Sequence, residues 1–556
     1  MRRAPLAVVV GVLSVGLAGC GAQADIIITG GQIWAGGERA GRPVAGAVAI
    51  ADGRILAVGD SARIARYVGQ GTEVLSAAGG LVLPGFADGH THFLSGGFQL
   101  ASVDLRTSDS PREFVRRLKE YARTLRPGAW ITGGDWDHER WAGAPLPRRD
   151  WIDSVTPRNP VFVSRLDGHM ALANSLALRA ARITKSTPDY EGGVIVRDRR
   201  SGEPTGVLKD NAMDPVLRVI PEPTAEQRDS ALVRALAHAA ALGVTAIADM
   251  STPAADLGSY RRIRDAGRLT LRAYLHFPLD AWRALADTVA RSGPGDDWLR
   301  IDGVKGYVDG SLGSTTALFF APYNDAPHTT GEMVTPEDSL RAWIGAADSA
   351  SLYVAVHAIG ERANAVLLAI FDSVARAHGP RDRRFRVEHA QHLRRADIPR
   401  FGALGVIPSM QPYHAIDDGR WAQKRIGPER IKTTYAFRSL LDSHAILAFG
   451  SDWTVAPLDP LQGLYAAVTR RTLDGKHPEG WVPEEKITLG EALQAYTAAN
   501  AYAMFAEGKW GTLEPGRLAD VVVLDRNLFA LAPDSLGQAK VRYTIVGGKV
   551  VYGNRG

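Results

Sequence analysis

The sequence predicts an α/β protein: a (β/α)8 TIM barrel with a large insertion after its first strand, plus a small β-sandwich domain formed by both termini. Short apolar runs alternate with helical stretches through the middle of the chain, and eight such runs can be counted. β-rich sequence at both ends predicts the second domain. The eight candidate barrel strands are residues 81–87, 244–250, 271–277, 301–308, 352–357, 385–389, 405–410 and 445–450.

The β-rich stretches at the two ends of the chain are short and separated by turns such as Asp52-Gly53. Neither end is large enough to bury a sheet alone. We therefore expect residues 25–83 and 506–556 to pair into one β-sandwich domain, which brings the termini together. The stretches concerned are residues 25–31, 44–50, 55–58, 72–75, 520–524 and 541–552.

The barrel domain is expected over residues 84–505, a longer stretch than the roughly 250 residues of a typical barrel of this kind. Most of the excess falls between the first two strands. This insertion, about residues 102–234, has its own helical stretches and several tryptophans. We expect it to supply much of the substrate pocket.

The start of the chain is similar to a bacterial lipoprotein signal peptide. Arg2 and Arg3 precede an apolar stretch that ends in Leu17-Ala18-Gly19-Cys20, so we expect residues 1–19 to be removed. Cys20 would then be lipidated, and residues 20–24 would tether the protein to the bacterial cell envelope, at the outer membrane and facing the periplasm or the cell surface. The alternative is an ordinary secretory signal with a chance cysteine.

The composition excludes some classes of partner. The formal net charge is +5, no basic run contains interleaved aromatic residues, and nucleic-acid binding is therefore not expected. Cys20 is the only cysteine, which rules out an internal disulfide. We expect a small-molecule substrate and membrane contact through the lipid anchor alone. The oligomeric state is open, with a homodimer as one alternative.

The stretch from Gly85 to His92 contains the pattern His90-Thr91-His92 at the end of the first candidate strand. Residues two apart in a strand point to the same side, so both imidazoles can face one point. Neutral imidazole is a common ligand for divalent transition metals. The alternative interpretation is a pair of surface histidines in a polar loop.

Further residues with metal-ligand chemistry follow later strands. Lys305 lies in the fourth candidate strand, His357 ends the fifth, Glu388-His389 ends the sixth, and Asp452 follows the eighth. Chemistry in TIM barrels lies at the C-terminal ends of the strands. A histidine at one strand end is ordinary in a protein core, but five strand ends with such residues indicate a common site.

The chain resembles the amidohydrolase superfamily, and more closely amidohydrolase family 3, the YtcJ-like branch that includes N-substituted formamide deformylase. The resemblance runs from about Asp25 to the C-terminus. Two departures are Thr315, where arginine often stands, and Glu361, where aspartate is expected. Beyond the paired histidines, the blocks that carry the resemblance are Asp167-Gly168-His169, Asn174-Ser175, Pro204-Thr205-Gly206, Asp309 to Ser314, His357 to Gly360, Glu388 to Gln391, Ser409 to Pro412 and Gly450-Ser451-Asp452.

The resemblance implies two divalent metal ions. His90 and His92 would hold one ion with Asp452, and His357 and His389 would hold the other. Lys305, carboxylated by carbon dioxide, would bridge both, since an ammonium group has no lone pair to offer. A hydroxide shared by the metals would be the nucleophile and Asp452 the general base. Zinc is the first choice for this imidazole-rich set, and manganese or iron would also fit.

Four residues are candidates for substrate contact. Trp136 and His169 lie in the insertion, and Glu361 and His414 follow barrel strands. His169 is either a transition-state hydrogen-bond donor with a catalytic role or a structural histidine. Trp136 has packing in the protein core as its alternative.

The expected function is a metal-dependent amidohydrolase that cleaves a non-peptide C–N bond in a formamide, an N-acyl amine or a cyclic amide. One alternative is a deaminase of a ring amidine with a single metal, for which Glu361 would be the required glutamate. Lys305 argues against it, because a single ion has no use for a bridging carbamate. A second alternative is a catalytically inactive, lipid-anchored binding protein.

Overall fold

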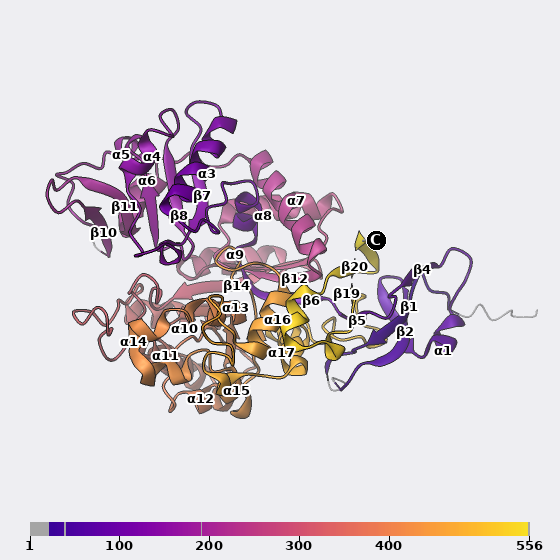
Figure 1. Ribbon diagram of the computed structural model, residues 1–556. Coiled ribbons are helices and arrows are strands. Elements are labelled where there is room, and N and C mark those ends of the chain that lie inside the picture. The colour runs from indigo at the N-terminus through magenta and orange to yellow at the C-terminus, as the bar shows by residue number, and fades with distance from the viewer. Residues whose placement is uncertain (1–21, 38–40, 191, 554–556) are drawn as a thin grey trace, which may run out of the picture.

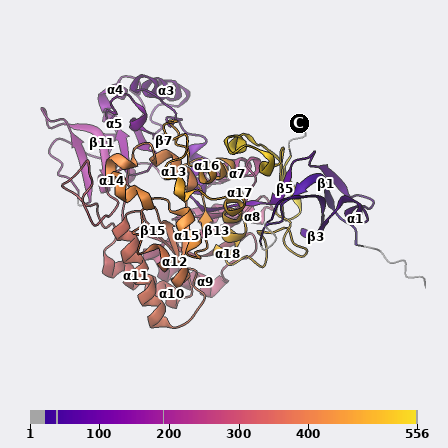
Figure 2. The same cartoon turned by 60° about the horizontal axis from the view of Figure 1, so that its bottom comes forward.

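The structure of the protein is a computed structural model that describes residues 22–37, 41–190 and 192–553. The predicted signal peptide and Cys20 lie outside these described residues. The chain forms a barrel, an insertion that packs on it, and a terminal β-sheet; Figures 1 and 2 both show the insertion and the terminal sheet at different sides of the barrel. No helix in the described ranges is long and apolar enough to cross a membrane.

Eight strands form the barrel, and each pairs in parallel with the next one along the chain. The barrel closes where the chain beyond the last strand meets the first. There, the Asp452 N–H donates to the His90 carbonyl at 2.7 Å, and the His92 N–H donates to the Trp453 carbonyl at 2.6 Å. The TIM-barrel prediction is therefore confirmed. The strands are β6 (Phe86–Thr91), β12 (Val244–Asp249), β13 (Arg272–Pro278), β14 (Leu299–Tyr307), β15 (Tyr353–Ala358), β16 (Arg386–His389), β17 (Ile407–Met410) and β18 (Ala448–Phe449).

The first predicted strand, residues 81–87, is in fact two strands in two different sheets. β5 (Leu81–Pro84) belongs to the terminal sheet, and β6 of the barrel begins after Gly85. A Cβ atom on Gly85 would lie 2.2 Å from the Thr245 hydroxyl oxygen, so no larger residue fits there. The chain passes from one sheet to the other at this glycine, and the two sheets are joined without a linker.

Helices cover the outside of the barrel (Figure 1), and local sequence marks where they begin. The helix after the insertion starts with a capping box, in which Thr224 and Gln227 bond each other's backbone groups. The apolar faces of the helices and the outer faces of the strands form one continuous core. The helices are α7 (Ala225–Ala241), α8 (Ala254–Asp265), α9 (Trp282–Ser292), α10 (Glu337–Ser349), α11 (Glu361–His378), α12 (Ile398–Leu404), α15 (Phe437–Asp442), α16 (Pro460–Thr469), α17 (Leu489–Ala495) and α18 (Ala498–Ala503).

The terminal strands form one hydrogen-bonded sheet of eight strands, in the order β21-β20-β19-β5-β1-β2-β3 with β4 beside β1. The two ends of the chain meet where β19 runs antiparallel to β5, as expected from their shared β-rich sequence. Apolar side chains from both ends share one core. The strands are β1 (Ile26–Ile33), β2 (Val44–Ala51), β3 (Arg54–Gly59), β4 (Glu73–Ser76), β19 (Val521–Leu524), β20 (Val541–Val546) and β21 (Lys549–Gly553), with helix α1 (Ser61–Ala65) beside them.

The insertion folds as a separate layer of five strands and short helices, with its own apolar core. It lies over the end of the barrel at which the strands finish, because its loops line the same cavity as residues from those strand ends. Its sheet order is β10-β11-β9-β8-β7. The elements are α3 (Pro111–Thr124), β7 (Ile131–Trp136), α4 (Arg149–Asp153), β8 (Val161–Arg165), β9 (Met170–Ala173), α5 (Ser175–Ala180), β10 (Gly193–Arg197), β11 (Pro204–Asp210) and α6 (Asp214–Leu217).

Candidate metal centre

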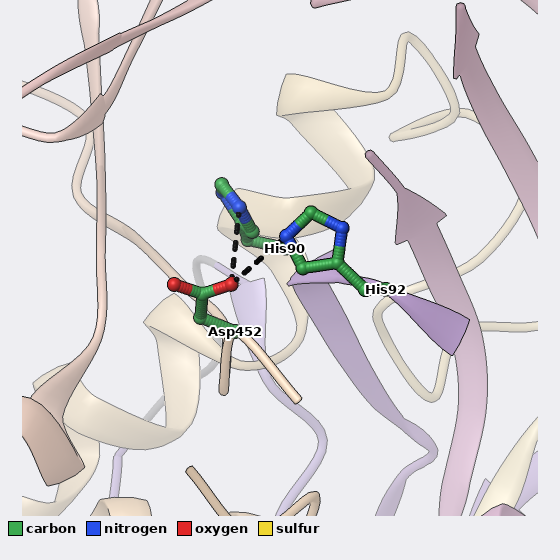
Figure 3. A group of neighbouring side chains, drawn as sticks. All are labelled: His90, His92 and Asp452. Atoms are coloured by element: carbon green, nitrogen blue, oxygen red, sulfur yellow. Dashed lines mark ion pairs between the residues drawn. The ribbon is translucent and has the colours of Figure 1, made fainter. Parts of the chain in front are cut away.

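His90 and His92 converge on one carboxylate oxygen, as Figure 3 shows. His90 lies near the end of β6, and His92 lies just beyond it, at the start of α2 (Phe93–Gln99). The Nε2 atoms of His90 and His92 lie 3.5 Å and 3.2 Å from Asp452 Oδ1. The expectation that both rings face the same point is confirmed, and Asp452 joins them there.

The second nitrogen of each ring is held by an acceptor from another part of the protein. His90 Nδ1 lies 2.6 Å from Glu388 Oε2, and His92 Nδ1 lies 3.1 Å from the Met250 carbonyl oxygen. Both acceptors require the Nδ1–H tautomer, which leaves the Nε2 lone pair directed at Asp452. Metal-binding histidines are oriented in this way in known proteins.

Glu388 is a site residue whose role the sequence did not reveal. It directly precedes His389, and its carboxylate contacts His90 and pairs with Arg386 at 2.8 Å. Burial alone would raise the pKa of Glu388, but Arg386 and His90 hold it well below its usual range. The group therefore remains an anion that accepts the hydrogen bond from His90 Nδ1.

Asp452 is held in place by the junction between the first and last strands. Its backbone has a φ of 56°, a left-handed conformation that is uncommon outside glycine. Asp88, also absent from the predicted site, accepts hydrogen bonds from the N–H groups of His90 at 3.0 Å and Ser451 at 2.9 Å. Burial raises the pKa of Asp88 to about 7. These bonds fix the two strand ends that carry His90 and Asp452.

The chemistry of this group fits a divalent metal ion. Among the described residues, His90 Nε2 and Asp452 Oδ1 are buried without a hydrogen-bond partner, which is costly unless another ligand satisfies them. Burial and, second, the charge of Lys305 lower the pKa of His90 to about 4, so its ring is neutral. Burial would raise the pKa of Asp452, but its contacts with His90, His92 and His389 hold it well below its usual range. A neutral imidazole beside a carboxylate is a typical zinc ligand set.

A second group of candidate ligands shares the same aspartate. The ligand atoms of His389, His414 and Asp452 lie within 4.8 Å of one another, as do those of His90, His92 and Asp452. His389 Nδ1 donates to Gln411 Oε1 at 2.8 Å. His357 was expected beside His389, and their rings are 4.6 Å apart, but its Nε2 is used by the Gly310 carbonyl oxygen at 3.2 Å. The structure thus adds His414 to the set of candidate ligands.

Lys305 lies on β14 at the floor of the site and is 2% exposed. Its Nζ lies 4.6 Å from the centre of the Tyr307 ring. Within the described ranges, no carboxylate forms an ion pair with it, and Asp309 and Asp452 lie against histidines instead. Asp309 instead accepts hydrogen bonds from three backbone N–H groups, of Leu318, Ile359 and Gly360.

These groups open into a cavity of about 240 Å³ between the barrel and the insertion. The volume suits a small molecule. The paired guanidinium of Arg165 and the loop of Asp167, Gly168 and His169 form the insertion's side of it. On the barrel side, the lining residues are His90, His92, Lys305, Tyr307, Ser311, Leu312, Gly313, His357, Ile359, His389, Gln391, His414, Asp417, Asp418, Arg420, Trp421, Asp452 and Val455.

His169 faces this cavity and is held from behind by Asp210. The distance from His169 Nδ1 to Asp210 Oδ1 is 2.9 Å, and the Asp210 N–H donates to the His169 carbonyl. Burial would lower the pKa of His169, but the hydrogen bond with Asp210 and the charge of Asp167 raise it overall. His169 is therefore suited to donate a hydrogen bond from Nε2, and Asp210 was not identified from the sequence.

Two candidate substrate contacts are not in the cavity. Trp136 is 0% exposed in the core of the insertion, where its indole N–H donates to the Val163 carbonyl oxygen at 2.8 Å. The structure therefore shows Trp136 packed in the core of the insertion, which was the alternative considered for it. Glu361 is the first residue of α11, outside the cavity wall.

A model described as the amidohydrolase family matches residues 73–552 of the chain. The chain is 41% identical to the protein named "Protein LONG AFTER FAR-RED 3" of Arabidopsis thaliana, over 96% of this chain and 92% of that protein. It is 31% identical to "Putative amidohydrolase YtcJ" of Bacillus subtilis, over 91% and 96% of the two chains. It is 29% identical to N-substituted formamide deformylase of Arthrobacter pascens, over 92% and 95%.

A solved structure is also similar to this chain over most of its length. An uncharacterized metal-dependent hydrolase from Pyrococcus horikoshii OT3 is similar with a TM-score of 0.74 and 29% identity. The likeness covers 92% of this chain and 99% of that one. It therefore includes most of the insertion and of the terminal sheet as well as the barrel.

Proposed function

The chain belongs to the amidohydrolase family, and from this premise we propose that it hydrolyses the C–N bond of a formamide, another N-acyl amine or a cyclic amide with the help of bound divalent metal ions. The observation that carries the proposal is the position of Asp452. Its buried Oδ1, which has no hydrogen-bond partner among the described residues, faces His90 and His92, and the other oxygen lies 3.9 Å from His389 Nδ1. One ionised carboxylate beside several imidazoles suits both metal binding and proton transfer.

The residues that would hold the metals are those whose lone pairs converge. His90, His92 and Asp452 would hold one ion, and His389 with its neighbours would hold a second. Zinc suits this ligand set best. Lys305, which is buried, lines the same cavity and has no ion pair with a carboxylate in the described part of the chain, would carry a carbamate that contributes oxygen ligands to both ions.

The chain's own residues would then carry the proton and the developing charge. Bound divalent ions would supply a water of lowered pKa as nucleophile and would polarise the scissile carbonyl. Asp452 would accept a proton from the attacking water and would pass the same proton to the amine nitrogen when the C–N bond breaks. The reaction balances as amide plus water giving acid plus amine. His169 donates a hydrogen bond to the carbonyl oxygen as negative charge develops on it.

The named relatives guide the choice of substrate. N-substituted formamide deformylase acts on formamides by its name, and the cavity of about 240 Å³ suits substrates of modest size. Deamination by a single-metal site is disfavoured, because Glu361 is not among the residues that line the cavity. We therefore place N-substituted formamides first and other N-acyl amines and cyclic amides second.

The test is a hydrolysis screen of metal-loaded protein over N-substituted formamides, N-acyl amines and cyclic amides, with release of amine as the readout. A double variant, His90→Ala with His92→Ala, is the matched control and should release none. Absence of turnover by metal-loaded wild-type protein across all three classes would overturn the proposal.

The anchor forms a separate proposal. We propose that Cys20 is lipidated and holds the protein at the bacterial cell envelope. The support is the lone cysteine at the end of a signal-like segment. The first described residues enter the terminal sheet, which Figures 1 and 2 place at a different side of the barrel from the insertion. A tether at this point would leave the cavity accessible to soluble substrates.

A further inference from the structure

Asp418 lines the cavity without a cationic partner in the described part of the chain. It is the last residue of α13 (Pro412–Asp418), the short helix that follows β17, and it is partly buried. The other cavity-lining carboxylates each lie in a pair with an arginine or a histidine, and these are Asp137, Asp167, Asp417 and Asp452. A carboxylate withdrawn from water is costly unless another group compensates its charge.

The two carboxylate oxygens of Asp418 have different surroundings. Oδ2 accepts hydrogen bonds from the Tyr435 hydroxyl at 2.6 Å and from the Gln391 side-chain amide at 2.8 Å. Oδ1 accepts none within the described ranges, and it is not among the atoms buried without a partner, so it remains open to the cavity. Burial raises the pKa of Asp418 to about 7, although the bond from Tyr435 opposes this shift. A cation bound at Oδ1 would stabilise the ionised form.

The charged side chains around Asp418 do not supply that cation. Arg165 and Arg420 line the same cavity, but each already pairs with two carboxylates, one of which they share; these are Asp137, Asp167 and Asp417. His169 is paired with Asp210. Carboxylates thus outnumber guanidinium groups in this part of the wall even before Asp418 is counted, which favours a cationic ligand.

Asp418 lies one helical turn beyond the metal centre. His414, four residues earlier on α13, has its ring 6.4 Å from that of His389, and both His414 and Asp418 line the cavity. Residues four apart share one face of a helix and are about 6 Å apart along its axis. A substrate whose scissile carbonyl lies at the metal centre can therefore extend a chain to Asp418. A formamide has only a hydrogen on its acyl side, so this chain belongs to the amine part.

We propose that Asp418 is a specificity-determining residue that binds a positively charged nitrogen on the amine part of the substrate. This rests on the proposed hydrolysis of formamides and other N-acyl amines, and it names a class within them: N-acylated amines that carry a second, protonated amino group. Oδ1 accepts the hydrogen bond from that group, while Oδ2 keeps its bonds with Tyr435 and Gln391. Asp418 does not touch the reacting atoms, so its role is selection of the substrate.

The experiment compares two substrates of equal size. N-(5-aminopentyl)formamide carries a terminal ammonium group, and N-hexylformamide has a methyl group in its place. For metal-loaded wild type, we expect kcat/KM to be about 10–100-fold higher for the cationic compound, the effect of one hydrogen bond to a charged group. Asp418→Asn should bring the ratio of the two values close to one. The asparagine oxygen can still accept the bonds from Tyr435 and Gln391, so this variant removes the charge and keeps these contacts.

Two control variants separate the charge of Asp418 from its structural contacts. Tyr435→Phe removes one hydrogen bond to Asp418 but keeps the carboxylate, and Asp198→Asn removes a carboxylate from a surface turn of the insertion. Both should keep the wild-type ratio, and thermal unfolding checks that each variant folds. An unchanged ratio in folded Asp418→Asn would overturn the proposal. Equal kcat/KM values for the two compounds in wild type would also overturn it, and this comparison needs no variant.

Binding measured without turnover separates this proposal from the proposed reaction. Metal-loaded Asp452→Asn protein, in which turnover should be slow, is titrated with both compounds by calorimetry. Tighter binding of the cationic compound, lost when Asp418→Asn is added, supports the role of Asp418 even if wild type hydrolyses neither compound. Equal affinities for the two compounds would overturn that role. Hydrolysis of N-hexylformamide with no preference for the cationic compound would overturn the role of Asp418 and leave the proposed reaction in place.

Discussion

Glu388 and His90 form a hydrogen bond of 2.6 Å across the inside of the barrel, between side chains of β16 and β6. Both are fully buried, and Glu388 also pairs with Arg386. The bond determines which nitrogen of His90 is free to bind a metal. It ties His90 to the third strand away from β6 across the closure of the barrel.

Glu388→Gln should therefore weaken metal binding. The amide is a poorer acceptor for His90 and leaves the Arg386 guanidinium buried without its counter-ion. We expect about 10–100-fold weaker zinc binding and a loss of about 3–5 kcal/mol in the free energy of unfolding. Chelator titration and denaturant unfolding measure the two effects. Glu361→Gln, a change outside the cavity, is the control and should alter neither quantity.

Asp452→Asn should reduce turnover much more than it reduces metal content. The amide still offers an oxygen to a metal, but it does not accept the proton of the attacking water. General-base catalysis contributes typically 10²–10⁴-fold, so kcat should fall by about that factor. The test is to measure kcat and zinc per chain for the same preparations of wild type and variant. A variant with kcat near that of wild type would show that Asp452 is not the base.

Lys305→Ala should lose most of the second ion and most of the activity. Added short-chain carboxylic acids should restore part of both by supplying the missing oxygen ligands. The direct measurement is a carbamate signal from metal-loaded wild type prepared with ¹³C-bicarbonate, absent from the alanine variant. An unmodified lysine in protein that carries two ions per chain would contradict the carbamate.

Asp210→Asn should change the pH dependence of the reaction. The Asp210 carboxylate raises the pKa of His169, so the charged donor persists to higher pH in wild type. Activity that depends on this donor is lost as pH rises through that pKa, and the variant should lose it at lower pH. The raised pKa of His169 also adds to the free energy of unfolding. This contribution is fully present below the unfolded pKa of about 6.5 and is lost as pH rises through the folded pKa of His169.

We expect kcat to fall and KM to change little in the Asp210→Asn variant, because the bond to the carbonyl oxygen strengthens only as charge develops. The profile of kcat/KM against pH is the measurement. Asp198→Asn, a change in a surface turn of the insertion, is the control. If kcat/KM falls at the same pH on the basic side in wild type and in Asp210→Asn, the His169–Asp210 pair has only a structural role.

Cys20→Ser should release the protein from the membrane fraction and leave its activity unchanged. Acylation requires the thiol, and no other cysteine is available. Cell fractionation with mass spectrometry of the mature N-terminus tests this. If the serine variant remains in the membrane fraction to the same extent as wild type, the lipoprotein interpretation is wrong.

Local patterns in the sequence predicted the barrel and much of its site. Apolar runs of strand length alternating with helices predict a parallel barrel, and the barrel in turn places His90, Lys305, His357, His389 and Asp452 at one end. These predictions succeed because strand periodicity and strand direction are local properties. The family resemblance followed from the same blocks, and the family match over residues 73–552 confirms it.

The tertiary structure alone decided how side chains pair across the barrel. Glu388 orients His90, Asp88 joins the first strand end to the last, and Asp210 holds His169, all through contacts between residues distant in the chain. It also placed Trp136 in the insertion's core and His414 beside His389. The reason is geometric: sequence spacing gives the direction of a side chain along its own strand or helix, whereas its partner depends on barrel closure and on how the insertion packs over the strand ends.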